Sequence, residues 1–123
     1  MTPFHAVTQG EAIPLAQVPL GDIADFCDAI LDGVRQGQRL ACLCAEDAHH
    51  LLAVLADDAS GTLAVGRTRL EGGSYPSLTP RCPQAHLFER EMAEQFGLQP
   101  EGHPWLKPVR LSGTPGVIDF YRV

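Results

Sequence analysis

Residues 39–45 read Arg-Leu-Ala-Cys-Leu-Cys-Ala and residues 51–56 read Leu-Leu-Ala-Val-Leu-Ala, with a short polar link between them. Two short apolar runs joined in this way predict a pair of antiparallel strands. Because apolar residues fall on both alternating faces, we expect both strands to be central in a sheet that is covered on both sides. A third strand is predicted over residues 62–70, which alternate more loosely before the breakers Gly72 and Gly73.

Two helices are predicted beside this sheet. Residues 21–36 carry apolar side chains at helical spacing with acidic residues on the other side, and Gly37 fits a helix stop. A second helix is predicted over residues 83–96, because Pro83 suits the first helical position and Gly97 suits the left-handed residue that ends a helix. The fold class is therefore α+β, a mostly antiparallel sheet with two main helices packed on it.

The length of 123 residues, with 45% hydrophobic residues, is that of one ordinary domain. We expect a single domain over residues 1–123, with a core of about residues 1–104 and an extended Pro-rich tail over residues 105–123. Residues 1–20 carry three prolines, which suits an edge strand or an extended arm. Residues 75–83 also carry three prolines, so they are predicted to be an extended lead-in rather than a central strand.

Charge and cysteine spacing exclude several functions. The net charge is −6 and the nine Lys and Arg residues are scattered, which argues against a nucleic-acid partner. No apolar run approaches the ~18 residues that span a bilayer, and no signal sequence precedes the domain, so a cytoplasmic location is expected. The cysteines form no Cys-x-x-Cys pair, so we expect free thiols without a metal or iron–sulfur cluster at all four positions: Cys27, Cys42, Cys44 and Cys82. Cys42 and Cys44 should share one face of a strand.

The predicted second helix contains one anomalous carboxylate. Its sheet-facing arc is formed by Ala85, Phe88, Met92 and Phe96, and Glu89 falls at the edge of that arc. An unpaired carboxylate would be costly to bury there.

Two interpretations of Glu89 stay open. In one it is solvated at the rim, or accepts a hydrogen bond from Arg81 or a backbone amide, and has no role beyond the fold. In the other it pairs with a cation of the following loop, such as His103 or Lys107, and so fixes a docking surface. On the opposite side of the helix, Arg90 and Glu94 are expected to form an exposed i,i+4 pair.

The histidines form no catalytic motif. His86 and Glu89 lie three residues apart, but a helical zinc-hydrolase motif needs a second His where Arg90 stands. His49 and His50 are adjacent at the approach to a strand, where neighbouring side chains point apart. No catalytic, cofactor-binding or metal-binding residue is predicted.

Four spaced elements carry a resemblance to a known family: residues 75–80 (Tyr-Pro-Ser-Leu-Thr-Pro), 88–91 (Phe-Glu-Arg-Glu), 95–97 (Gln-Phe-Gly) and 101–104 (Glu-Gly-His-Pro). In this order they resemble the signature of the 30-kilodalton subunit of respiratory complex I. That family includes the related amino-terminal domain of formate-hydrogenlyase-type [NiFe] hydrogenase large subunits.

The resemblance implies a role in electron transport that is structural rather than catalytic. It implies an α+β domain in the peripheral arm of an NADH:quinone oxidoreductase or a membrane-bound [NiFe] hydrogenase, peripheral to the inner membrane and in contact with the membrane only through the complex. Such a domain binds no flavin, iron–sulfur cluster or nickel and braces the catalytic or quinone-site large subunit. The family's core positions map onto Glu89, Arg90, Glu91, Phe96, Gly97, Gly102 and His103.

The chain also departs from the complex I pattern. Complex I members usually continue Gly-His-Pro with an acidic residue, Leu and Arg, whereas residues 105–107 read Trp-Leu-Lys here. Residues 79–86 look closer to the hydrogenase-type branch, and residues 117–123 resemble the link to a fused large-subunit domain. Trp105, the only tryptophan, is expected either to anchor an interface or to pack in the core.

Two other classes of function remain as alternatives. One is a small independent enzyme that uses His86 or His103 with Glu89 or Glu91 as an acid–base pair. The other is a self-associating binding module whose apolar patch is covered by a second copy. The sequence does not separate the complex I branch from the hydrogenase branch, and it does not reveal the electron donor or the oligomeric state.

Overall fold

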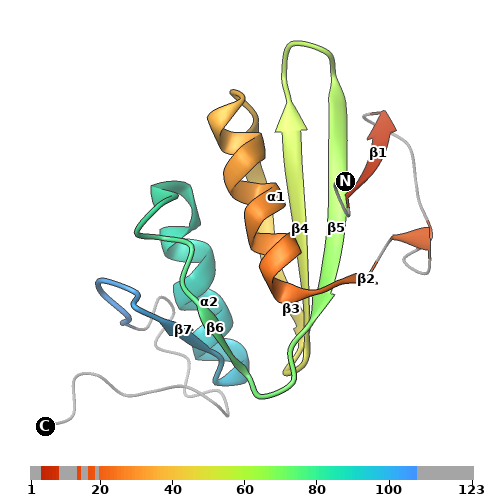
Figure 1. The fold of residues 1–123 in the computed structure, drawn as a ribbon. Helices are drawn as coiled ribbons and strands as arrows, with labels where there is room; N and C mark the ends of the chain where they lie inside the picture. The colour runs from red at the N-terminus through yellow and green to blue at the C-terminus, as the bar shows by residue number, and fades with distance from the viewer. Residues whose placement is uncertain (1–3, 9–13, 15–16, 19, 108–123) are drawn as a thin grey trace, which may run out of the picture.

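The computed structural model describes residues 4–8, 14, 17, 18 and 20–107. Its elements follow the order β1 (His5–Thr8), β2 (Leu20–Gly21), α1 (Ile23–Arg35), β3 (Arg39–Asp47), β4 (His50–Asp57), β5 (Thr62–Arg69), β6 (Ser74–Pro76), the 3-10 turn η2 (Pro83–Ala85), α2 (His86–Phe96) and β7 (Gln99–Glu101). The α+β class with a mostly antiparallel sheet and two main helices is confirmed (Figure 1). Most of the Pro-rich tail predicted over residues 105–123 lies outside the described residues, including residues 117–123, which resemble a link to a fused domain.

The main sheet has the strand order β1-β5-β4-β3, and β2 pairs in parallel with β5. β4 is central, as predicted, but the prediction for β3 is wrong because it lies at the sheet edge. Its apolar run does not face solvent there, because α2 contacts β3 and the Leu40 amide donates to the Gln84 side chain at 2.8 Å. The expected coverage of both sheet faces is not found in the described residues, because α1 and α2 contribute to one core cluster.

Both helices contribute to one hydrophobic core. α1 begins after the cap residue Asp22, whose carboxylate accepts from the Asp25 amide at 2.8 Å, and lies across the sheet with Phe26 and Ile30 fully buried (Figure 1). Residues of α2 such as Met92 join the same cluster. The second sheet face carries a smaller cluster formed by Val7, Val18 and Val65, and in the described part of the chain no helix covers it.

A separate two-stranded sheet joins the segment before α2 to the segment after it. β6 pairs in parallel with β7, so the segment before the helix and the segment after it lie side by side (Figure 1). The predicted lead-in is thereby confirmed as peripheral to the main sheet. α2 itself starts after the 3-10 turn at Pro83 and ends at Gly97, whose φ of 70° is the left-handed conformation that glycine adopts readily. This pairing places residues 77–79 and residues 103–107 in contact with α2.

Candidate functional site

The Glu89 carboxylate is fully buried and holds the loop that precedes α2. Its Oε1 accepts from Ser77 Oγ at 2.6 Å, from the Thr79 amide at 3.1 Å and from Thr79 Oγ1 at 2.5 Å, and its Oε2 accepts from the Leu78 amide at 3.0 Å. Two amides and two hydroxyls together offset the cost of burying a charge. The anomalous carboxylate is therefore a built-in part of the fold, satisfied on both oxygens.

The structure confirms part of the first interpretation of Glu89 and corrects the second. Glu89 is not solvated at the rim, and it does not pair with His103 or Lys107 of the following loop, whose contacts lie elsewhere. The expectation of a backbone amide donor is confirmed, but the donors come from the preceding loop. The sequence signal that could have indicated this is the pair of hydroxyl residues Ser77 and Thr79, which stand between two prolines just before the helix.

The Tyr75 hydroxyl and the Cys27 thiol, which lie near Glu89, are hard to deprotonate. Burial, reinforced by the charge of Glu89, raises the pKa of Tyr75 above its ordinary value and raises the pKa of the Cys27 thiol to about 12. The Tyr75 hydroxyl lies near Glu89, but it is buried without reaching hydrogen-bond geometry to a partner in the described residues. These two groups stay protonated at neutral pH, so neither provides a phenolate or thiolate beside Glu89.

Arg90, the next residue, ties α2 to the segment that follows it. Its Nε donates to the Lys107 carbonyl at 2.8 Å. His103 Nε2 lies 3.2 Å from the His86 carbonyl, and His103 Nδ1 accepts from the Trp105 amide at 3.1 Å. These two contacts assign the neutral tautomer with its proton on Nε2, and burial lowers the pKa of His103 in agreement with a neutral ring.

Trp105 lies on the outside of this segment. Trp105 is 54% exposed, which shows that the core-packing interpretation is wrong. The ring stacks on His86 with centroids 6.4 Å apart, and the Arg90 guanidinium and Lys107 Nζ each lie 5.3 Å from its centroid. The His86 ring in turn stacks on His103, with centroids 5.1 Å apart. We call these five residues, His86, Arg90, His103, Trp105 and Lys107, the tryptophan surface.

The remaining signature residues have mainly structural surroundings. Gly97 ends α2, and Gly102 has a φ of 87° in the turn after β7. Glu91 is half-buried, with the Gln95 amide 3.5 Å from its carboxylate. Two expectations from the helical wheel are wrong: Phe96 is 36% exposed and Glu94 is only 3% exposed. The wheel assumed one packing surface, whereas α2 contacts both β3 and β7, and this rotates its buried arc.

The acid–base alternative finds no support in this geometry. Glu89 is saturated by donors of the preceding loop, and His103 uses both ring nitrogens for backbone groups. A general acid–base pair needs a ring nitrogen within reach of the carboxylate or of a substrate. Within the described ranges, no three His, Cys, Asp or Glu side chains are placed to hold a metal ion, and Cys42 and Cys44 are free thiols on one face of β3. The contacts of Glu89, Arg90 and His86 hold the loops before and after α2 against that helix.

Comparison with protein families identifies the chain. The family model described as "Respiratory-chain NADH dehydrogenase, 30 Kd subunit" matches residues 16–116, which include both loops and α2. A search of curated proteins gives no match. In the part of the chain that the structure describes, no helix is long and apolar enough to cross a membrane. Because the matched residues cover most of the sequence, the chain belongs to the family of respiratory-chain NADH dehydrogenase 30 Kd subunits.

Proposed function

We propose that this chain is a cofactor-free structural subunit, or domain, that docks the adjacent large subunit of its oxidoreductase complex through the tryptophan surface. The family supports a place in a complex of the NADH dehydrogenase type. The docking role rests on one observation, the exposed Trp105 ring held in a fixed stack with His86 and beneath two cations. Trp and Arg are the side chains most enriched among residues that dominate binding energy at protein interfaces.

The order of this surface lowers the cost of binding. A free Trp side chain on a tail would lose rotamer freedom on docking, whereas Trp105 is already restrained by the rings and cations around it. Arg90 and His103 hold the backbone on either side of the ring through hydrogen bonds to Lys107 and to His86 and Trp105. The surface is therefore preorganised, and its burial by a partner gains apolar contact at little ordering cost.

The partner in this proposal is the catalytic or quinone-site large subunit, either separate or fused after this domain. It belongs to complex I or to the related membrane-bound [NiFe] hydrogenase, since residues 79–86 resemble the hydrogenase-type branch and residues 105–107 depart from the complex I pattern without separating the two. The domain supports electron transfer by positioning that subunit, from the cytoplasmic side and peripheral to the inner membrane. The coding sequence that follows Val123 separates the branches, since paired Cys-x-x-Cys motifs there indicate the nickel-binding subunit.

Replacing Trp105 with Ala tests the docking role. We expect the affinity for the large subunit, measured by calorimetry with the full chain, to fall at least tenfold because an interface anchor is worth more than about 1.4 kcal/mol. The melting temperature should stay unchanged, since the ring is exposed in the free chain. Leu20→Ala is the matched control, because Leu20 is 52% exposed on β2 and lies outside the tryptophan surface. Equal affinities for the Trp105 and Leu20 variants would refute the proposal.

A further inference from the structure

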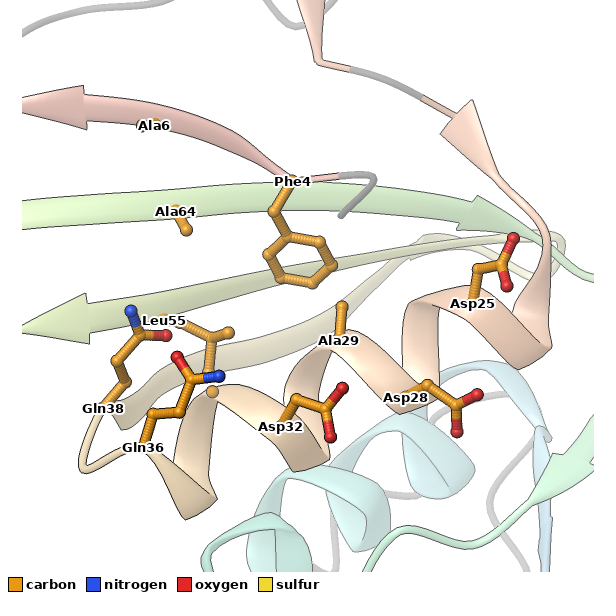
Figure 2. A pocket seen from close by; sticks show the side chains of 11 residues that line it. Phe4, Ala6, Asp25, Asp28, Ala29, Asp32, Gln36, Gln38, Leu55 and Ala64 are labelled. Carbon is orange, nitrogen blue, oxygen red and sulfur yellow. The ribbon is translucent and has the colours of Figure 1, made fainter. Parts of the chain in front are cut away.

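A groove lies between α1 and the strands β1 and β5, and no residue of the tryptophan surface lines it (Figure 2). Its volume is about 450 Å³, within the range of ligand pockets in proteins. The apolar side chains of Phe4, Ala29, Leu55 and Ala64 line its interior. Figure 2 shows Asp25, Asp28 and Asp32 spaced along the helix that forms one wall.

Close packing at one end and small side chains in the middle create this groove. At Gly33 a Cβ atom would lie 2.6 Å from Leu55 Cδ1, so α1 approaches β4 closely there. Phe4 lies over Gly66 in the same way, since a Cβ at Gly66 would fall 2.3 Å from its ring, and its ring packs on Phe26 with centroids 5.7 Å apart. Ala29 and Ala64 between these contacts are too short to fill the space. The apolar floor is therefore fixed before anything binds.

The acidic wall lacks enough cations to neutralise it. Asp32 pairs with Arg35 at 2.8 Å, whereas Asp25 and Asp28 make no ion pair among the described residues. Two other arginines are engaged elsewhere, Arg39 with Asp58 and Arg67 with Glu46. Two unpaired carboxylates thus stand along an apolar floor, and a partner that fills the groove would place its own charges beside them.

We infer that this groove binds a segment of a second partner protein that presents Lys or Arg side chains beside a small apolar residue. The apolar residue packs on Phe4 and Leu55, and the cations lie against Asp25 and Asp28. A second copy of this chain is the wrong occupant, because it carries a net charge of −6. The groove and the tryptophan surface lie on different helices, so the domain bridges two protein segments in the assembled complex.

A charge reversal with a matched control tests the groove. The double variant Asp25→Lys/Asp28→Lys is compared with Glu71→Lys/Glu101→Lys, which changes the net charge equally at two exposed positions outside the groove. Each full-length variant replaces the native chain in the organism, and the intact complex is purified. We expect the groove variant to lower the yield of intact complex at least tenfold and the control to leave it unchanged.

Two further variants separate docking from folding. Asp25→Asn/Asp28→Asn removes the charges at nearly constant shape, and Ala29→Phe fills the floor without changing charge. Both should weaken assembly while the melting temperature of the isolated chain stays within about 2 °C of the wild type. Assembly equal to that of the control in both variants would overturn the inference, even if the charge reversal unfolds the chain.

Carbodiimide cross-linking of the wild-type complex identifies the occupant. The reagent activates a carboxylate, a lysine amine attacks the activated carbon, and an amide forms as the carbodiimide leaves as its urea. We expect a cross-link from Asp25 or Asp28 to a lysine-containing segment of another subunit, lost in the Asn double variant. Cross-links only within this chain, or only between two copies of it, contradict the inference. Binding of the large subunit that depends on Trp105 but not on these aspartates would leave the proposed function intact and refute the groove.

Discussion

Glu89 and Arg90 are adjacent on α2, yet the two regions that they organise differ in every physical respect. Glu89 is fully buried and is saturated by donors of residues 77–79, whereas Arg90 reaches over an exposed ring to the backbone of Lys107. The first region is buried, since Glu89 and residues 77–79 are shielded from solvent. The second presents aromatic and cationic groups to solvent. The same signature therefore contains one residue that holds a buried loop and one that holds the surface proposed for docking.

The largest loss of stability is expected from a substitution at the buried residue Glu89. Replacing Glu89 with Gln keeps the shape but turns an acceptor into an amide donor that faces amide and hydroxyl donors, so at least one buried group loses its partner. We expect the free energy of unfolding, measured in urea, to fall by about 2–4 kcal/mol. Glu71→Gln, at an exposed position, should change it by less than about 0.5 kcal/mol. A Glu89 variant as stable as this control would show that the buried carboxylate is not needed as an acceptor.

A smaller effect is expected at Arg90. Arg90→Lys keeps the charge but loses the Nε that donates to the Lys107 carbonyl, which should cost about 1–2 kcal/mol of stability. Because Trp105 is the only tryptophan, its fluorescence anisotropy reports the order of the tryptophan surface alone. We expect the anisotropy to fall in Arg90→Lys and to stay unchanged in Arg81→Lys, at an exposed position. Unchanged anisotropy in both variants would show that Arg90 does not restrain the Trp105 ring.

A substitution in the turn after β7 tests the backbone that leads into the tryptophan surface. Gly102 has a φ of 87°, and a Cβ there would meet no atom within 4 Å, so Gly102→Ala adds backbone strain without a clash. We expect a loss of about 1 kcal/mol in the free energy of unfolding. Gly72→Ala is the control, since its φ is not in the left-handed region and its Cβ also meets open space. An equal response of the two variants would mean that the turn is not constrained.

The smallest effect should be a pH response of the tryptophan surface. The pKa of His103 is lowered from its usual 6.5, chiefly by burial, so its neutral form is favoured in the folded chain. The stability that this contributes is present above pH 6.5 and is lost as the pH falls through the lower folded pKa. Protonation also removes the acceptor for the Trp105 amide, so tryptophan emission should shift in that window. His103→Asn should show no such shift, and a shift that persists in it would assign the titration to another group.

Local patterns predicted more of the fold than of the site. The helical spacing in α1, the Pro and Gly boundaries of α2 and the apolar run of β4 were sufficient, because each element is specified by its own residues. The edge position of β3 was missed, because its apolar run packs against α2, an element distant in the sequence. The partner of Glu89 was missed because a carboxylate at the rim of a helix does not reveal which loop folds over it.

The most direct test of the docking role measures Trp105 inside the complex. With 5-fluorotryptophan incorporated in this chain alone, the single tryptophan gives one ¹⁹F resonance, and an unlabelled partner adds no signal of its own. We expect addition of the unlabelled large subunit to shift this resonance and to remove its sensitivity to solvent D₂O, because the exposed ring becomes buried. A complex that forms while the resonance keeps its position and its solvent sensitivity would contradict the central claim that the open side of α2 is the docking surface.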